Sequence, residues 1–222
     1  MRKTIFVILL LCMPIFLFAQ SGVIRSLNGT VEIKHSGTPN YVAARAGDTV
    51  REDTTVYVGL RSTAVIDVGS TVILVQPLTR LTLREIRASQ DDERLNVDLR
   101  AGRVRIEVNP PAGLRMSMSV TSPSATASVR GTTFVFDTRT VRVEHGSVLF
   151  QGNRGYAVQV NAGSVSVVST AGAASAPAPS NETQVSSPVG LDNSSRPGNE
   201  AEAVTGPGSR LGYVDVNVGY PQ

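Results

Sequence analysis

The chain has little of what most thiol enzymes and metalloproteins rely on. Its 222 residues include one cysteine, two histidines and no tryptophan. The cysteine, Cys12, lies in an apolar N-terminal run, so the rest of the chain has no thiol. Disulfides, thiolate catalysis and cysteine metal sites are therefore excluded from the remainder of the protein. Two histidines also leave few candidates for a catalytic base.

Charge is sparse and evenly spread. Charged residues make up 18% of the chain, and the formal net charge is +3. Residues 21–169 hold 17 basic and 13 acidic residues, and nearly all of the basic ones are arginines scattered along the segment. Nucleic-acid binding calls for a concentrated basic stripe with aromatic side chains. The sequence has no such stripe, so we expect no nucleic-acid partner.

The N-terminus reads as an export signal. Arg2 and Lys3 precede an almost unbroken apolar run over residues 5–18, and Ala19-Gln20 is a plausible cleavage point. The run is shorter than the roughly 20 residues that a membrane-spanning helix needs. We predict a signal peptide at 1–19 and an exported protein of the periplasm or cell envelope. Membrane contact would then occur only through this segment before cleavage. A retained N-terminal anchor is the alternative.

The C-terminal segment, residues 170–222, has a different composition. It is rich in Ala, Pro, Ser, Asn and Gly, and such a segment buries too little apolar surface to offset its ordering entropy. We predict a low-complexity linker or tail that proteases cut first. Residues 211–218 alternate between apolar and polar and are open to two interpretations, an added strand or a disordered end.

Residues 21–169 are predicted to form a single all-β domain. Apolar residues recur with a period of two in nearly every segment, and each short run is bounded by Gly, Pro, Asn or Asp. The best helical candidate, residues 78–88, is weakened by β-branched residues. A glycine-led rhythm recurs at Gly102-x-Val104, Gly146-x-Val148 and Gly163-x-Val165. This pattern favours short stacked strands in a β-helix-like or twisted two-sheet body over a closed barrel.

Residues that could carry catalysis occur in the wrong patterns. His145, Ser147 and Asp137 could be imagined as a nucleophilic triad, but no Gly-x-Ser-x-Gly elbow presents the hydroxyl. The acidic run at 91–93 lacks the alternating spacing of a calcium loop and is interpreted as a solvated turn. Gly131-Thr132 is followed by a strand pattern, whereas a phosphate loop leads into a helix. We therefore expect no enzyme activity, no cofactor and no bound metal.

One long motif is the most informative part of the chain. Residues 122–136 read Ser-Pro-Ser-Ala-Thr-Ala-Ser-Val-Arg-Gly-Thr-Thr-Phe-Val-Phe, and residues 141–148 read Val-Arg-Val-Glu-His-Gly-Ser-Val. This pair resembles the signature of the FecR-type domain, the periplasmic iron-dicitrate sensor module of bacterial regulators. The resemblance covers roughly residues 56–168. It includes 95–104, similar to the family's Leu-x-Leu-x-x-Gly-x-Val, and 160–163, similar to its closing Val-x-Ala-Gly.

The resemblance also has one departure. Where the family has Asp-Gly-Ser after a strand, this chain has Val68-Gly69-Ser70, which leaves that turn short of one capping oxygen. We expect the signature residues to be structural, with Val129 and the phenylalanines in the core and glycine 131 in a bulge or a close backbone approach. The signature residues are Pro123, Arg130, Gly131, Thr132, Phe134, Gly146 and Gly163.

The resemblance implies a non-catalytic exported interaction or sensor module that binds another envelope protein. Only 19 residues precede the predicted domain, so we expect the module without the family's cytoplasmic anti-sigma part. The alternative is a cell-wall glycan or polysaccharide binder, or a structural envelope protein. Arginines such as Arg100, Arg103 and Arg105 could meet anionic polymers, although exposed aromatics for sugar binding are few.

Overall fold

The computed structural model describes residues 21–180, and this part of the chain consists of strands, turns and loops. The predicted signal peptide, residues 181–222 of the predicted tail and the ambiguous segment 211–218 lie outside the described residues. Within 21–180 there is no helix long and apolar enough to cross a membrane. The helical candidate at 78–88 is a strand, as its β-branched residues favour.

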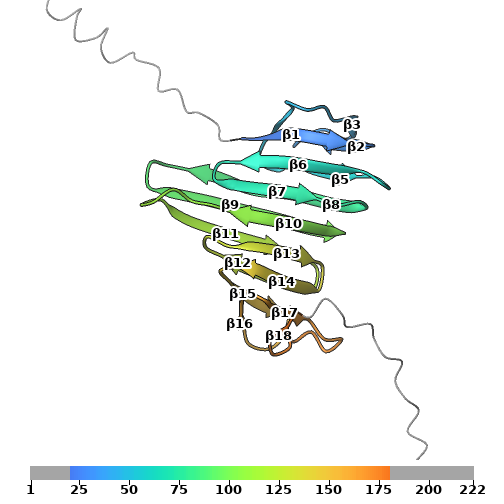
Figure 1. Ribbon diagram of the computed structural model, residues 1–222. Helices are drawn as coiled ribbons and strands as arrows, with labels where there is room; N and C mark the ends of the chain where they lie inside the picture. Colours follow the sequence, from blue (N-terminus) through green and yellow to red (C-terminus); the bar gives the residue numbers. More distant parts are fainter. Residues whose placement is uncertain (1–20, 181–222) are drawn as a thin grey trace, which may run out of the picture. The chain divides into compact units, whose positions relative to one another are not determined.

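Eighteen strands form two nine-stranded sheets that face each other (Figure 1). Sheet A contains, in spatial order, β18 (Ala178–Pro179), β17 (Ser164–Val167), β14 (Thr140–His145), β13 (Thr133–Asp137), β10 (Arg103–Val108), β7 (Thr71–Val75), β6 (Thr63–Val68), β1 (Gly22–Asn28) and β4 (Thr49–Val50). Sheet B contains β16 (Val158–Asn161), β15 (Ser147–Gly152), β12 (Ala125–Val129), β11 (Arg115–Thr121), β9 (Asp92–Ala101), β8 (Thr79–Ala88), β5 (Thr55–Val58), β2 (Val31–Lys34) and β3 (Val42–Ala43). The twisted two-sheet body is thus confirmed, and neither sheet closes into a barrel.

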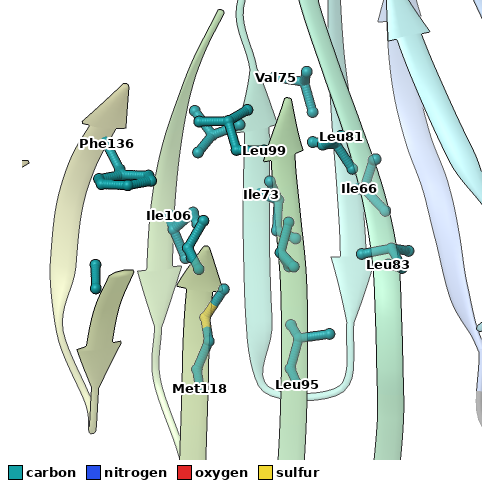
Figure 2. Packing of buried hydrophobic residues seen from close by; sticks show 14 of the residues in the cluster. Ile66, Ile73, Val75, Leu81, Leu83, Leu95, Leu99, Ile106, Met118 and Phe136 are labelled. Carbon is teal, nitrogen blue, oxygen red and sulfur yellow. The ribbon is translucent and has the colours of Figure 1, made fainter. Parts of the chain in front are cut away.

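The core lies between the two sheets because alternate residues of each strand point inward. In strands such as β6 and β10 every second residue is buried and the residues between are partly or fully exposed, as in a half-buried strand. Figure 2 shows aliphatic side chains from both sheets meeting in this layer, with Met118 and Phe136 toward the C-terminal part. Phe136 meets Phe150 edge to face, with ring centroids 6.2 Å apart. Val129, Phe134 and Phe136 are buried as predicted.

The chain passes from one sheet to the other at sharp corners where the backbone is left-handed. Each of these corners contains a residue with positive φ, most of them glycine, since glycine adopts this conformation without steric cost. These residues are Gly29 (+75°), Arg61 (+54°), Leu78 (+56°), Gly102 (+88°), Gly131 (+64°), Gly146 (+80°) and Gly163 (+76°). The glycine-led rhythm seen in the sequence marks three of these corners.

The corners lie at opposite ends of the strands in the two halves of the sandwich. Val75, the last residue of β7, pairs with the first residues of β6 and the start of β10, so the early corners share one end. Thr133, the first residue of β13, pairs with the ends of β10 and β14, so the later corners share the other end. The long connection over residues 109–114 moves the chain between the two ends.

That connection also produces the one parallel strand pair among the described strands. β11 runs parallel to β9 over seven register pairs, from Arg115–Asp92 to Thr121–Asp98. All other strand pairs in both sheets are antiparallel, and some of them, such as β6–β7 and β8–β9, are local hairpins. The β9–β11 pair in sheet B and the antiparallel β10–β13 pair in sheet A therefore join an N-terminal half, residues 22–108, to a C-terminal half, residues 115–180.

The C-terminal end of the sandwich differs from the predicted pattern in two ways. Ordered structure continues beyond residue 169, because β18 pairs with β17 and the Ser180 amide donates to the Gly163 carbonyl at 2.8 Å. In β17 the period of two would place Val165 and Val167 in the core, but Ser166 is the buried residue. Its hydroxyl donates to the Ser175 carbonyl at 2.8 Å, so the returning segment supplies a polar partner.

Candidate functional site

The signature residues meet at one corner of the C-terminal half. The buried Thr132 hydroxyl donates to the Ser147 carbonyl at 2.9 Å, which ties the β12–β13 corner to the β14–β15 corner. Gly146 lies against the same threonine: a Cβ at this position would lie 3.0 Å from both the Gly131 carbonyl oxygen and Thr132 Oγ1. The two motifs that lie apart in the sequence thus form a single packed node.

The same arrangement occurs twice in the N-terminal half. The Thr79 hydroxyl accepts the Arg103 amide at 3.0 Å, and a Cβ on Gly102 would lie 2.2 Å from that hydroxyl. The Ser62 hydroxyl accepts the Thr30 amide at 2.8 Å, with a Cβ on the preceding Gly29 placed 2.3 Å away.

We call this arrangement the hydroxyl–glycine corner. A hydroxyl from one corner bonds to the backbone of the residue that follows the glycine of the neighbouring corner. In each instance the hydroxyl forms a hydrogen bond with a backbone group at the turn that has no partner in the β-sheet. A compact fold requires such groups to be paired. The signature therefore encodes a structural device of the scaffold.

The remaining signature residues have separate positions. Gly131 has φ +64°, but a Cβ there would come no nearer than 3.8 Å to Pro110. Its conformation favours glycine, and the predicted close approach is wrong, because a Cβ there would make only ordinary van der Waals contact. Arg130 is exposed, Phe134 is buried, and the Pro123 carbonyl in the β11–β12 turn accepts a bond from the Asn153 side chain at 2.6 Å.

The departure at Val68 is compensated from the other sheet. Glu93, at the start of β9, accepts the Ser70 amide at 2.9 Å and the Ser70 hydroxyl at 2.6 Å, which caps the Gly69-Ser70 turn of sheet A. Glu93 is buried, so the interpretation of 91–93 as a solvated turn is wrong for this residue. Sequence reasoning missed the pairing because the two partners are 23 residues apart and lie in different sheets.

The three residues considered for catalysis do not assemble. His145 and Ser147 are exposed, and His145 pairs with Thr133 at one end of β13. Asp137 is the last residue of the same strand and, at the rise of an extended chain, lies about 13 Å from Thr133. Its carboxylate accepts hydrogen bonds from the Arg139 and Thr140 amides. Among residues 21–180, no cluster of three or more His, Cys, Asp or Glu side chains could hold a metal ion.

The arginines proposed for anionic polymers are divided between the two faces and are paired with acids. Arg100 lies on sheet B and contacts Asp98 at 2.8 Å. Arg105 lies on sheet A and bonds to Glu144 at 2.7 Å; this hydrogen bond raises the pKa of the guanidinium above its ordinary value. Arg103, also on sheet A, is 3.7 Å from Asp137. Together they do not form a single free basic surface.

The outer face of sheet B changes character along its length. In the N-terminal half Arg84 bridges Asp53 at 3.1 Å and Asp98 at 3.4 Å, and Arg100 shares the same aspartate. In the C-terminal half the outward side chains of β11, β12 and β15 beyond Arg115 carry no charge. We call this surface the neutral platform; it comprises Ser117, Ser119, Thr121, Thr126, Ser128, Leu149 and Gln151.

The register brings the platform residues into rows. Ser119 pairs with Ser128, which pairs with Leu149, whose side chain is 52% exposed. An open cleft of about 420 Å³ lies where the platform meets the charged half, lined by Asp98, Arg100, Ser119 and Thr121 among others. The platform is thus a flat hydroxyl and amide surface bordered by arginine.

Comparison with known proteins identifies the domain. A model of the family described as FecR protein matches residues 54–166, about half of the chain, from the β5 region to β17. No curated protein matches it. Two solved structures of a protein from Parabacteroides distasonis ATCC 8503, provisionally named an anti-sigma factor, are similar at 15% identity with TM-scores of 0.46 and 0.45. In both cases the match covers 56% of this chain and 59% of the neighbour. On the family match, together with the signature residues that build its corners, the chain belongs to the FecR family.

Proposed function

We propose that this chain is a non-catalytic interaction module of the bacterial cell envelope that binds another envelope protein. The observation that carries the proposal is the use of the family signature. Thr132, Gly146 and Ser147 are engaged in holding neighbouring corners together, so in this chain these residues serve the scaffold. Recognition then falls to the outer faces that the scaffold presents. Export rests on the predicted signal peptide at 1–19 and on the periplasmic setting that the family implies.

The neutral platform is the surface that best suits a protein partner. The centres of protein interfaces are depleted of charged residues, whereas their rims are polar. The platform is likewise without charged side chains, with Leu149 exposed on β15, the outermost of its three strands, and with Arg115 and Arg130 at one end. In the charged half of the same sheet, Arg84 and Arg100 are already in contact with Asp98.

A pull-down from envelope extracts with the tagged protein tests this proposal. We expect a reproducible partner, identified by mass spectrometry, whose recovery falls at least tenfold for Leu149→Asp. Ser26→Asp, an exposed substitution on β1 of sheet A, is the matched control and should retain the partner. Equal loss with both variants, or no reproducible partner for the unaltered protein, would contradict the proposal.

Glycan binding is a second candidate because the platform offers hydroxyl and amide groups. Two observations weigh against it: Arg100, Arg103 and Arg105 are paired with acids, and the chain has no tryptophan. Co-sedimentation with purified peptidoglycan separates the two functions. Clear pelleting that Leu149→Asp abolishes would favour the glycan over the protein partner.

A further inference from the structure

Strand β16 is an open edge of sheet B. It pairs with β15 on one side, and no strand among residues 21–180 pairs with its other side. The core beneath it is nevertheless covered, since Val160 is fully buried and Ala174 packs against the same cluster. What this edge offers to solvent is therefore backbone, not core.

The register identifies which backbone groups face outward. The Ala162 amide donates to the Gly146 carbonyl at 3.0 Å, and hydrogen-bonded pairs alternate along an antiparallel ladder. Val160 and Val158 consequently form the bonded pairs with β15. The amides and carbonyls of Gln159 and Asn161 then point away from the sheet.

The other three edges are better protected. In sheet A at the same end, β18 has only two residues, and one of them, Pro179, lacks an amide hydrogen. At the opposite end, β3 and β4 are also two residues long and are bordered by the charged Arg45, Asp48 and Arg51. Natural sheets commonly use short strands, proline and charge to prevent edge pairing. The β16 edge is four residues long, and residues 155–169 contain neither proline nor a charged residue.

We propose that β16 is a self-association edge and that its occupant is β16 of a second copy of the chain. Antiparallel pairing about a two-fold axis at Val160 places Gln159 opposite Asn161 of the partner copy. The axis produces this pair twice in the dimer. This register joins the outward groups in four backbone hydrogen bonds and extends sheet B through both molecules. A neutral strand can pair with itself without bringing like charges into opposition. Because the contact is isologous, it closes at the dimer.

This inference is independent of the proposed function, since it concerns the edge of sheet B and not the platform on its face. Sedimentation velocity over a range of concentrations tests it on the full exported protein. We expect a reversible dimer whose mass approaches twice that of the monomer. Gln159→Lys combined with Asn161→Lys would place like charges opposite each other twice, so this variant should remain a monomer throughout.

Two further variants test the register. Gln159→Lys combined with Asn161→Asp places opposite charges across the axis and should restore the dimer. Gln90→Lys combined with Ala112→Lys adds the same charge at exposed loop positions and should dimerise like the unaltered protein. Thermal unfolding confirms that each variant is folded.

Three outcomes would overturn the proposal. They are an unaltered protein that stays monomeric, a double-lysine variant that still dimerises, and a mass that rises beyond the dimer, as head-to-tail pairing of β16 with β3 would produce.

Discussion

The two halves of the sandwich build the same corner at opposite ends of their strands. In the N-terminal half Thr79 bonds beside Gly102, and in the C-terminal half Thr132 bonds beside Gly146. The direction of the chain differs between them, because residues 109–114 carry it across to the other end before β11 begins. In both halves, a side-chain hydroxyl forms a hydrogen bond with a backbone group at the turn between the sheets, whichever end of the strands the turn occupies.

The halves differ in charge and in the residues that fill the core. Residues 22–108 contain 12 basic and 11 acidic residues, whereas residues 115–180 contain five and two. The N-terminal half therefore ties its outer faces with ion pairs, and the C-terminal half leaves the neutral platform. Inside, the C-terminal half supplies all three fully buried phenylalanines, Phe134, Phe136 and Phe150, and the N-terminal core is aliphatic.

Gly102→Val should have the largest effect on stability. Comparison with Gly131→Val should distinguish the tightly packed Gly102 corner from the more open Gly131 corner. The new Cβ would lie 2.2 Å from Thr79 Oγ1 and 2.7 Å from the Leu78 carbonyl, at φ +88°. Overpacking and backbone strain together predict a loss of about 3–5 kcal/mol in the free energy of unfolding. A Cβ in Gly131→Val would make only ordinary van der Waals contact with Pro110, so this variant should lose only the strain energy, about 1–3 kcal/mol. Denaturant titration compares the two, and equal losses would contradict the distinction.

Glu93→Ala tests the link between the sheets within the N-terminal half. It removes the acceptor of the Ser70 amide and hydroxyl and should cost about 1–3 kcal/mol, because the turn is left without its partner. Glu93→Gln keeps one oxygen acceptor and should lose less. The free energies of unfolding of the two variants provide the measurement. If both were as stable as the unaltered protein, the turn would not depend on this carboxylate.

Thr132→Val and Thr79→Val compare the hydroxyls of the two corners directly. Each keeps the side-chain shape and removes a hydroxyl whose partner is the backbone, so each should cost about 1–2 kcal/mol. Similar losses would support one device used twice. A loss of stability confined to Thr132→Val would mean that the hydroxyl matters at the signature corner and that the Thr79 hydroxyl does not stabilise its own corner.

Arg84→Met should have the smallest effect, limited to the charged half. The Arg84 side chain is about half exposed, and exposed ion pairs contribute about 0–1 kcal/mol. Its hydrogen bond to Asp53 raises the pKa of the guanidinium above its ordinary value, so Arg84 stays charged through the usual pH range. The difference from the unaltered protein should vanish in about 1 M salt, where screening is short-ranged. A loss that persists at high salt would indicate packing of the arginine stem.

The sequence predicted the fold class because the period of two is local to each strand. The alternation of β6 or β10 is visible in six consecutive residues. The glycine rhythm likewise marked corners, since positive φ leaves a direct trace in residue choice. The family signature predicts that Thr132 and Gly146 are structural, but it does not indicate that they are in contact.

Longer-range features left no such trace. Nothing near Val68 indicates that Glu93 caps the turn that follows it. Likewise, nothing near Gly102 indicates that the Thr79 hydroxyl accepts a hydrogen bond from the next amide, that of Arg103. The burial of Ser166 depends on a segment that returns after residue 169, and composition alone described that segment as a tail. The neutral platform required the register of three strands, which a list of strands does not contain.

The order of strands also determines how the domain would bear mechanical load. The chain enters through β1 near one end of the stack and leaves beside β17 and β18 at the other (Figure 1). A force applied between these points acts across the strands, along the hydrogen bonds that join them. Hydrogen bonds loaded in this direction break one after another. When the force instead runs parallel to the strands, many hydrogen bonds between two strands resist it at the same time. As a tether the domain would yield by successive peeling of strands and would act as a soft, extensible link.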